Sequence, residues 1–264
     1  MQGHRLFTVG GHQVALCSRP SVPAMGIFTR VLCESLCLHH RIRVIDVGCG
    51  SGIVGIYALL EGSAGVLFND IQPEALKCVR RNLALNGLVS GCSLHCGPFA
   101  DLRLDEVTAY DLIAFDPPQF PLGLDARAFA PAEAVFRSGG ADGLDVVCQF
   151  LDWYQGLGSR SPVATLVLSS ILGEERIYSE IIDRRALRLS VVHRCALPLR
   201  NALVEALRRR SPLDLPRLGV SSGLDGVWYK QLMVAQIRHP DRGGSSGVRS
   251  GDRGVSRVGE GPRR

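Results

Sequence analysis

A run of glycines near residue 50 follows a short apolar segment and has the composition of a ligand-binding turn. The segment VIDVGCGSGIVG (44–55) ends an expected buried strand and opens an expected helix. Glycines let the backbone turn sharply and approach a ligand, and the first turn of a helix offers free N–H groups. Asp70 ends the next expected strand, where its carboxylate can accept hydrogen bonds from both hydroxyls of a ribose. These residues predict a cofactor site.

Two cofactors are compatible with this glycine pattern. Residues 50–55 are a G-x-G-x-x-G sequence and Asp70 follows at the spacing of the dinucleotide fingerprint, which indicates a nicotinamide cofactor. The pattern also extends toward the N-terminus as D-x-G-x-G-x-G, formed by Asp46, Gly48, Gly50 and Gly52. This longer arrangement resembles the first motif of class I methyltransferases, where the methionine part of S-adenosylmethionine lies along the loop. The glycines alone leave both cofactors open.

The resemblance implies a set of residues for binding S-adenosylmethionine. They are Asp46, Gly48, Cys49, Gly50, Gly52, Asp70, Ile71, Phe99 and Asp116. Ile71 would offer an apolar surface to the adenine. In the family an acidic residue often follows the third strand and contacts the adenine amino group, but Pro98 takes that place here. Backbone atoms near Phe99, or an Asp101 side chain that reaches back, are the two alternatives for this contact.

A second group of polar residues ends the apolar strand expected at 110–115. Asp116, Pro117 and Pro118 follow this strand directly, and ligands of open α/β sheets bind at the carboxyl ends of strands. The prolines stiffen the turn, so that the Asp116 side chain and the Pro117 carbonyl can both accept N–H hydrogens from a target nitrogen. Holding these hydrogens would aim the nitrogen lone pair at a methyl donor, because most of the rate gain comes from positioning. Asp116 and Pro117 are therefore the predicted catalytic residues.

This segment resembles the (Asn/Asp)-Pro-Pro-aromatic motif of nitrogen-directed methyltransferases. That group includes enzymes that act on DNA adenine, on rRNA guanine and on release-factor glutamine. The fourth position here is Gln119, and Phe120 would have to supply the missing aromatic ring. The predicted substrate-binding residues are thus Asp116, Pro117, Gln119 and Phe120. Because Gln119 replaces the aromatic residue of the motif, a flat purine is disfavoured as the acceptor. A nitrogen of a small molecule or a protein side chain, including a glutamine-type amide, is favoured instead.

A further resemblance lies downstream of this motif. Residues 139–145 read GGADGLD and resemble the segment that follows the motif in release-factor glutamine methyltransferases. In physical terms this segment is a flexible loop, with Asp142 as the expected N-cap of the next helix.

The chain around these motifs alternates apolar runs with amphipathic stretches, which predicts an α/β fold. Strands are expected at 42–47, 64–70, 92–96, 110–115, 163–171, 187–197 and 227–237. Helices are expected at 52–62, 73–87, 142–157 and 173–186, and a hairpin at 6–17 with a helix at 24–39 precedes them. This pattern predicts a seven-stranded, mostly parallel sheet with helices on both faces. The resemblance implies the Rossmann-like class I methyltransferase fold, with the last strand antiparallel.

Composition divides the chain into three expected parts. Residues 1–40 are an N-terminal extension on the acceptor side, 41–238 form the cofactor-binding domain, and 239–264 are a Gly/Ser/Arg-rich tail expected to be disordered. The tail holds six arginines against three acidic residues, and the net charge of the whole chain is +5. The remaining part is therefore close to neutral, which makes a nucleic-acid substrate less expected than a small molecule or protein. Nucleic-acid methylation stays an alternative, as does a protein that binds the cofactor without catalysis.

The cysteine content and the apolar runs bear on where the protein is expected to be located and which ligands it could bind. Nine cysteines without a C-x-x-C pair indicate reduced thiols and a cytoplasmic location. No stretch of about 18 uncharged apolar residues is present, so no membrane-spanning helix is expected. No metal site is predicted, although Cys33, Cys37 and His40 could share one helix face. Nothing in the sequence indicates an oligomeric state.

Overall fold

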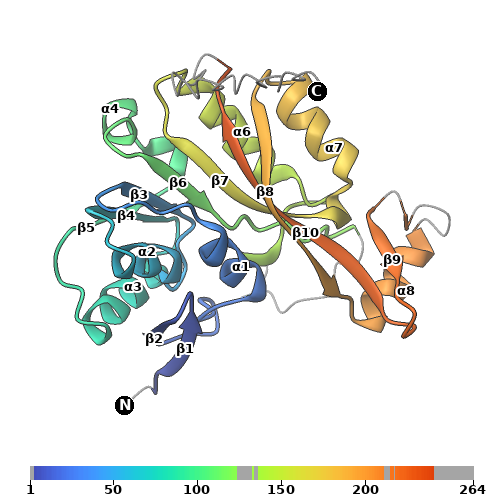
Figure 1. Cartoon of the computed structure of the whole chain (residues 1–264), viewed down its shortest axis with the longest axis horizontal. Helices are drawn as coiled ribbons and strands as arrows, with labels where there is room; N and C mark the ends of the chain where they lie inside the picture. Colours follow the sequence, from blue (N-terminus) through green and yellow to red (C-terminus); the bar gives the residue numbers. More distant parts are fainter. Residues whose placement is uncertain (1–2, 124–132, 134–135, 211–214, 217, 241–264) are drawn as a thin grey trace, which may run out of the picture.

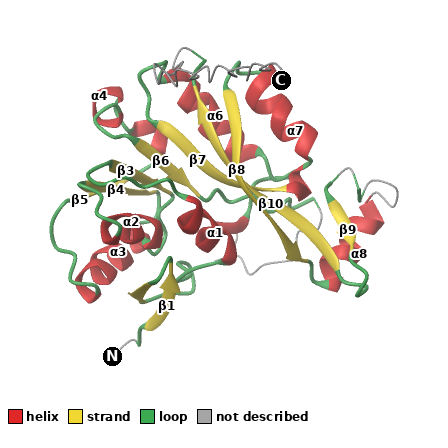
Figure 2. Cartoon of the chain, viewed as in Figure 1, coloured by secondary structure: helices red, strands yellow, loops and turns green. Residues whose placement is uncertain are grey.

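The computed structural model describes residues 3–123, 133, 136–210, 215–216 and 218–240 of the chain. Figures 1 and 2 show one large sheet with helices on both faces. The predicted α/β class is confirmed. The tail expected at 239–264 lies outside the described residues from 241 onward. In the described part, no helix is long and apolar enough to cross a membrane.

The main sheet has the strand order β5-β4-β3-β6-β7-β10-β8, and the short β9 pairs with β10. Strands β3 to β7 pair with one another in parallel, whereas β10 runs antiparallel to β7, β8 and β9. The predicted seven-stranded sheet with an antiparallel last strand is therefore confirmed, and β9 is an addition to it. The strands are β3 (Arg43–Val47), β4 (Gly65–Asp70), β5 (Cys92–Cys96), β6 (Leu112–Phe115), β7 (Val163–Ser169), β8 (Arg188–Pro198), β9 (Val220–Ser222) and β10 (Trp228–Arg238).

The four helices expected within the domain are present with slightly different ends. They correspond to α2 (Ile53–Leu60), α3 (Pro73–Leu85), α6 (Asp145–Gly156), and α7 (Glu174–Tyr178) continued by the π-helical turn η3 (Ser179–Asp183). The patterns did not predict α4 (Leu104–Val107), α8 (Asn201–Arg210) or the single turns η1 (Phe99–Asp101) and η2 (Ser170–Leu172). Figure 1 shows α8 and β9 beside the beginning of β10, away from the rest of the sheet.

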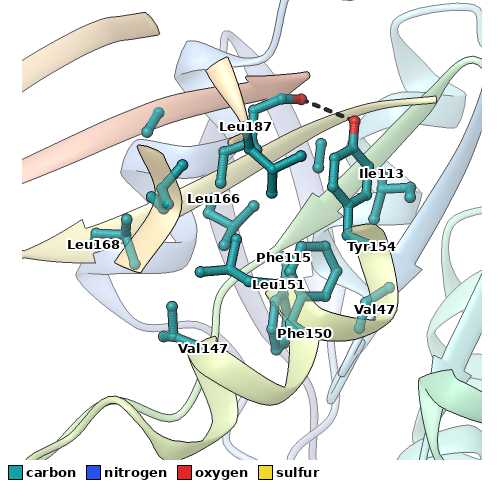
Figure 3. Packing of buried hydrophobic residues seen from close by; sticks show 14 of the residues in the cluster. Val47, Ile113, Phe115, Val147, Phe150, Leu151, Tyr154, Leu166, Leu168 and Leu187 are labelled. Carbon is teal, nitrogen blue, oxygen red and sulfur yellow. Dashed lines mark hydrogen bonds between the residues drawn. The ribbon is translucent and has the colours of Figure 1, made fainter. Parts of the chain in front are cut away.

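The two faces of the sheet carry two separate apolar cores, because successive residues of a strand point to opposite faces. On one face Ile45 and Ile113 pack against α6, whose buried residues repeat at helical spacing: Val147, Phe150, Leu151 and Tyr154. Figure 3 shows Phe115 and Phe150 in contact, with a ring-centroid distance of 4.9 Å. On the other face Val44 and Leu112 pack beneath α2, α3 and the N-terminal segment. The two apolar cores therefore cover both faces of the sheet and hold its strands in position.

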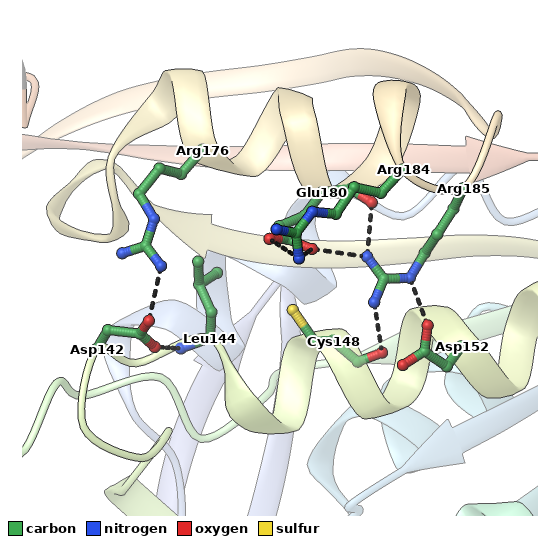
Figure 4. Close-up of polar contacts among 8 residues, drawn as sticks. All are labelled: Asp142, Leu144, Cys148, Asp152, Arg176, Glu180, Arg184 and Arg185. Carbon is green, nitrogen blue, oxygen red and sulfur yellow. Dashed lines mark hydrogen bonds and ion pairs between the residues drawn. The ribbon is translucent and has the colours of Figure 1, made fainter.

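A buried arginine fastens η3 to α6. The Arg185 side chain is 8% exposed, and its guanidinium donates hydrogen bonds to Asp152 Oδ1 at 2.7 Å and Glu180 Oε2 at 2.8 Å (Figure 4). Asp142, the expected N-cap, accepts the Leu144 N–H at 3.0 Å and pairs with Arg176. Helix α6 begins only at Asp145, with Leu144 as the N-cap residue, so the predicted cap position was wrong by two residues.

The N-terminal segment begins with a hairpin that is fastened to α3. Strands β1 (Arg5–Val9) and β2 (His12–Leu16) pair antiparallel, as the sequence predicted. The Asn86 side chain binds both backbone groups of Ala15, at 2.9 Å to its N–H and 2.8 Å to its carbonyl. Asn82, fully buried, accepts the Cys17 N–H at 2.8 Å and donates to the Ser51 carbonyl at 2.8 Å. One asparagine therefore connects the hairpin to the glycine-rich loop.

The helix that follows, α1 (Ile27–Ser35), is shorter than the predicted 24–39. Gly26 is extended, with φ −103° and ψ 170°, and Leu36 is extended at the other end. Residues 21–26 are not helical and line the pocket described below. Helix α1 itself contacts α2, β7 and β10, and Figure 1 shows it lying between α2 and β10.

A glycine substitution tests how closely α2 packs on β4. A Cβ at Gly55 would lie 2.3 Å from Phe68 Cε1 and 2.7 Å from Val66 Cγ1. Gly55→Ala should therefore lower the free energy of unfolding by about 1–3 kcal/mol through overpacking. Gly156→Ala is the control, because nothing lies within 4 Å of its Cβ position in α6. It should be neutral or stabilising by up to about 1 kcal/mol. Equal urea midpoints for the two variants would contradict this packing.

Candidate functional site

The site lies where the strand order of the sheet reverses. Strands β4 and β5 lie on one side of β3, and β6 and β7 lie on the other. The loops that leave the carboxyl ends of β3 and β6 therefore diverge to opposite faces and leave a crevice between them. A pocket occupies this position, and most of its lining comes from the end of β3 with the loop and first turn of α2 that follow, the end of β4, the residue after β6, and residues 21–29.

The glycine-rich loop after β3 forms the floor of this pocket. Gly48 and Gly52 have φ values of +59° and +80°, a conformation that L side chains rarely adopt. A Cβ at Gly52 would also lie 2.9 Å from Val79 Cγ2. The loop is fastened to β4 twice, because the Cys49 N–H donates to the Asn69 carbonyl and the Gly50 N–H donates to Asp70 Oδ2, both at 2.9 Å. At position 52, glycine is therefore required both by the backbone conformation and by the close approach of Val79 on α3.

Asp46 is the most buried carboxyl group of the site, with 2% of its surface exposed. Its Oδ2 accepts the Gly55 N–H at 2.9 Å and so joins β3 to the first turn of α2. Burial raises the pKa of Asp46 to about 8, and the nearby Asp70 and Asp116 carboxylates act in the same direction. The hydrogen bond from Gly55 opposes this shift only in part.

Asp70 at the end of β4 is 6% exposed, and both of its oxygens are oriented by backbone groups. Oδ2 accepts the Gly50 N–H and Oδ1 accepts the Gln72 N–H at 2.8 Å. Burial raises its pKa, while these two hydrogen bonds lower it. Each carboxylate oxygen has two lone pairs, so a pair of ribose hydroxyls could still donate to this group. The neighbouring Ile71 side chain is 59% exposed and offers apolar surface beside it.

Asp116 follows β6 and faces the same pocket from the other strand of the crevice. Its Oδ2 accepts a hydrogen bond of 2.6 Å from the Thr29 hydroxyl of α1. Burial raises the pKa of Asp116 to about 6, and the Thr29 hydrogen bond lowers it. Among the described residues, Thr29 is the one donor to this carboxylate, so Oδ1 has no partner in the described part of the protein.

The structure brings six of the predicted residues together and leaves six outside the pocket lining. Those that line it are Asp46, Gly48, Cys49, Gly50, Asp70 and Asp116, and those that do not are Gly52, Ile71, Phe99, Pro117, Gln119 and Phe120. The Phe99 ring packs into the aromatic core, 6.1 Å from Phe115 and 5.8 Å from Phe150 between ring centroids. The assignment of these twelve residues to cofactor and substrate stays a prediction.

Gln119, at the fourth motif position, is buried and tied to β7. Its amide donates to the Val167 carbonyl at 2.9 Å and to the Pro117 carbonyl at 3.3 Å, and its Oε1 accepts the Ser169 N–H at 2.7 Å. These bonds hold the loop after β6 against the longer strand β7. Phe120 forms a bridge with Ser138 instead of lining the pocket.

An aromatic ring reaches the pocket from elsewhere, because Phe136 is one of its lining residues. Sequence analysis missed Phe136, which lies 20 residues after Asp116 in a stretch without a periodic pattern. Sequence analysis also missed Thr29, Ser51 and Gln72, whose types carry no signal without the fold.

The charge of the pocket favours one of the two cofactors left open by the sequence. Three carboxyl groups line it, from Asp46, Asp70 and Asp116, and its described lining residues include no lysine, arginine or histidine. Like charges in a poorly solvated site repel, and an opposite charge relieves that repulsion. S-adenosylmethionine carries a sulfonium and an ammonium group and fits such a site, whereas a dinucleotide would add an anionic pyrophosphate. In the described part, no cluster of three or more His, Cys, Asp or Glu side chains could hold a metal ion.

Comparisons with known proteins agree with this choice. Residues 20–149 match the methyltransferase small domain family. The chain is 25% identical over 139 residues to a protein of Methanocaldococcus jannaschii named as a protein N5-glutamine methyltransferase, which covers 52% of this chain and 67% of that protein. It is 50% identical over 46 residues to the ribosomal protein L11 methyltransferase of Acinetobacter baumannii strain AYE, which covers 17% of this chain and 15% of that enzyme.

The two relatives match this chain over only part of their own length. The chain spans about two thirds of the first relative and less than a fifth of the second. Among solved structures, wild-type Trm5b from Pyrococcus abyssi is similar in fold, with a TM-score of 0.51 and 13% identity, covering 89% of this chain and 56% of Trm5b. This structural similarity concerns the fold alone.

The raised pKa of Asp46 predicts a dependence of stability on pH. The folded protein keeps Asp46 protonated up to about pH 8, whereas the unfolded chain releases the proton near the ordinary value of 3.8. Between these values unfolding releases a proton, so the free energy of unfolding falls as pH rises, by up to about 1.4 kcal/mol per pH unit. Asp46→Asn keeps an acceptor for the Gly55 N–H but does not ionise. Urea unfolding from pH 5 to 8 should show a steeper loss for the wild type, and parallel curves would contradict the assignment.

Proposed function

Residues 20–149 belong to the methyltransferase small domain family, and on that premise we propose that this S-adenosylmethionine-dependent class I methyltransferase methylates a nitrogen atom of a protein side chain, such as a glutamine-type amide. The observation that carries the proposal is the Asp116 carboxylate, which faces the pocket with Oδ2 held by Thr29 and Oδ1 without a described partner. A free carboxylate oxygen at this position suits an acceptor that presents an N–H group.

The cofactor-binding half of the pocket would be formed by the loop after β3 and the end of β4. Asp70 would accept the ribose hydroxyls, since its oxygens are already oriented by Gly50 and Gln72. Asp46 and the backbone of Gly48, Cys49 and Gly50 would surround the methionine part, where the carboxylates favour a cation. S-adenosylmethionine supplies a methyl group on a positively charged sulfur, which is already an activated leaving group.

The acceptor half would be formed by the residues after β6. Asp116 Oδ1 would accept a hydrogen of the target nitrogen, and this contact would orient the nitrogen toward the cofactor. The Pro117 carbonyl, predicted from the sequence to share this role, instead accepts the Gln119 amide. With a pKa of about 6, Asp116 is mostly ionised at neutral pH. Oδ1 could therefore also take the proton that the acceptor nitrogen releases. Most of the catalytic effect in this arrangement comes from holding two groups in line.

Two observations support a protein side chain over a nucleic acid. Both relatives described above carry the names of protein methyltransferases. The described lining of the pocket offers three carboxyl groups and no cation for a phosphate backbone. Phe136 adds an aromatic surface on which a planar amide group can lie.

A labelling experiment tests the class of acceptor. The purified protein is incubated with methyl-tritiated S-adenosylmethionine and a cell extract that has been separated into protein, nucleic-acid and small-molecule fractions. We expect the label in the protein fraction, and acid hydrolysis should release it as a methylated nitrogen compound. Label confined to nucleic acid would overturn the proposed substrate, and no transfer to any fraction would indicate a protein that binds the cofactor without catalysis.

Substitution of Asp116 tests the carboxylate itself. Asp116→Ala should lower the rate of transfer by about 10²-fold or more, because the acceptor nitrogen loses its hydrogen-bond partner. Its affinity for S-adenosylmethionine, measured by calorimetry, should stay within about threefold of the wild type. Asp105→Asn is the control, since Asp105 is exposed and paired with Arg103 away from the pocket. An equal loss of binding and transfer in Asp116→Ala would make this residue part of the cofactor site only.

A further inference from the structure

Thr29 lies at the junction between the N-terminal segment and the proposed acceptor site. It stands in the first turn of α1, and its hydroxyl donates to Asp116 Oδ2 at 2.6 Å across 87 residues of sequence. Thr29 also lines the pocket together with Met25 and Gly26. The sequence carries no motif at this position, and the contact depends on the packing of α1 against α2, β7 and β10.

The position of Thr29 is fixed by contacts on several sides. Leu32 and Cys33 of α1 are fully buried in the core above the sheet. The neighbouring Phe28 ring lies under the Lys230 ammonium group of β10, 4.3 Å from nitrogen to ring centroid. Before the helix, the Ala24 carbonyl accepts a hydrogen bond from the Ser51 hydroxyl of the glycine-rich loop. These contacts hold the beginning of α1, and with it Thr29, against the core, β10 and the glycine-rich loop.

The hydrogen bond has two consequences for the carboxylate. It occupies Oδ2 and fixes the rotation of the side chain, which leaves Oδ1 as the oxygen that can meet an acceptor. It also favours the ionised form, because a hydroxyl donates more strongly to a charged oxygen. Two titratable groups lie near this carboxylate: the Asp116 charge raises the pKa of Asp46 of β3 and that of the Cys33 thiol of α1. The Lys230 ammonium group of β10 lies over the Phe28 ring, and burial lowers the Lys230 pKa to about 8.

We propose that Thr29 is a positioning residue for methyl transfer: its hydroxyl holds Asp116 Oδ2 so that Oδ1 accepts the hydrogen of the acceptor nitrogen. This inference rests on the proposed function of Asp116. It also gives the N-terminal segment a role in the reaction, because the segment supplies the one described donor to the carboxylate. Thr29 acts through Asp116 and does not itself contact the reacting atoms.

The test compares Thr29→Val, which keeps the shape of the side chain without its hydroxyl, with Thr29→Ser, which keeps the hydroxyl. Thr29→Val should lower kcat by about 10-fold to 100-fold, because the orientation of the carboxylate is lost. Its affinity for S-adenosylmethionine should stay within about threefold of wild type, since Asp46 and Asp70 are unchanged. Thr29→Ser should retain most of the wild-type kcat. Unfolding curves of both variants check that the fold is intact.

A second measurement needs neither cofactor nor acceptor. Carbon-13 NMR of the Asp116 carboxyl group in the free protein gives its pKa directly. Without the Thr29 hydroxyl this pKa should rise by about one unit, and the acid limb of the pH profile of kcat/KM should move upward by the same amount. The serine variant should titrate like the wild type.

The outcomes separate the two proposals. A valine variant with wild-type kcat and an unchanged Asp116 pKa would overturn the role of Thr29 while leaving that of Asp116 intact. Loss of kcat without a change in the Asp116 pKa, or equal losses in valine and serine variants, would also overturn it and indicate a purely structural role. Full activity in Asp116→Ala would instead refute the proposed function, whereas the NMR shift in Thr29→Val would still establish the hydrogen bond.

Discussion

The constraint on which the site depends is the placement of three carboxyl groups in one poorly solvated pocket. Asp46 lies near the end of β3, Asp70 ends β4 and Asp116 follows β6, and these parallel strands bring their carboxyl ends to one edge of the sheet. Burial raises the pKa of all three, and the Asp70 and Asp116 charges raise that of Asp46 further. The protein offsets part of these shifts with hydrogen bonds from Gly50, Gln72, Gly55 and Thr29. What remains is a site that favours a cation.

This electrostatic character connects the fold with the family. A glycine-rich turn after the first strand and an acidic residue after the next are common to two classes of cofactor site. The loop geometry alone does not distinguish them, since both need a sharp turn and close approach of the backbone. The Asp116 carboxylate in the same pocket does distinguish them, because it is mostly ionised at neutral pH and would repel an anionic pyrophosphate. A methyltransferase, whose cofactor carries positive charge next to the reacting methyl group, avoids that repulsion.

The N-terminal segment completes the pocket through contacts that are distant in sequence. Asn82 and Asn86 on α3 bind the hairpin, and Asn82 also binds the Ser51 carbonyl of the glycine-rich loop. Helix α1 then packs against α2, β7 and β10, and its first turn brings Thr29 to Asp116. Residues of this segment therefore line the pocket although they lie outside the main sheet. The buried Asn82 holds both the N-terminal segment and the glycine-rich loop.

The sequence by itself determined the class of fold, the order of its main elements and the positions of Asp46, Asp70 and Asp116. These features are local: apolar periodicity defines strands and helices, and glycines and prolines mark the turns that follow them. Helix α8 and the strand β9 were not predicted, and their apolar residues form a small separate cluster with Ile171 of η2 and Trp228 of β10. The roles of Gln119, Phe136 and Thr29 were decided only by tertiary structure. Gln119 has its amide bound to β7, Phe136 lines the pocket in its place, and Thr29 meets Asp116 from 87 residues away. Such contacts depend on how separate elements pack, and no spacing along the chain encodes them.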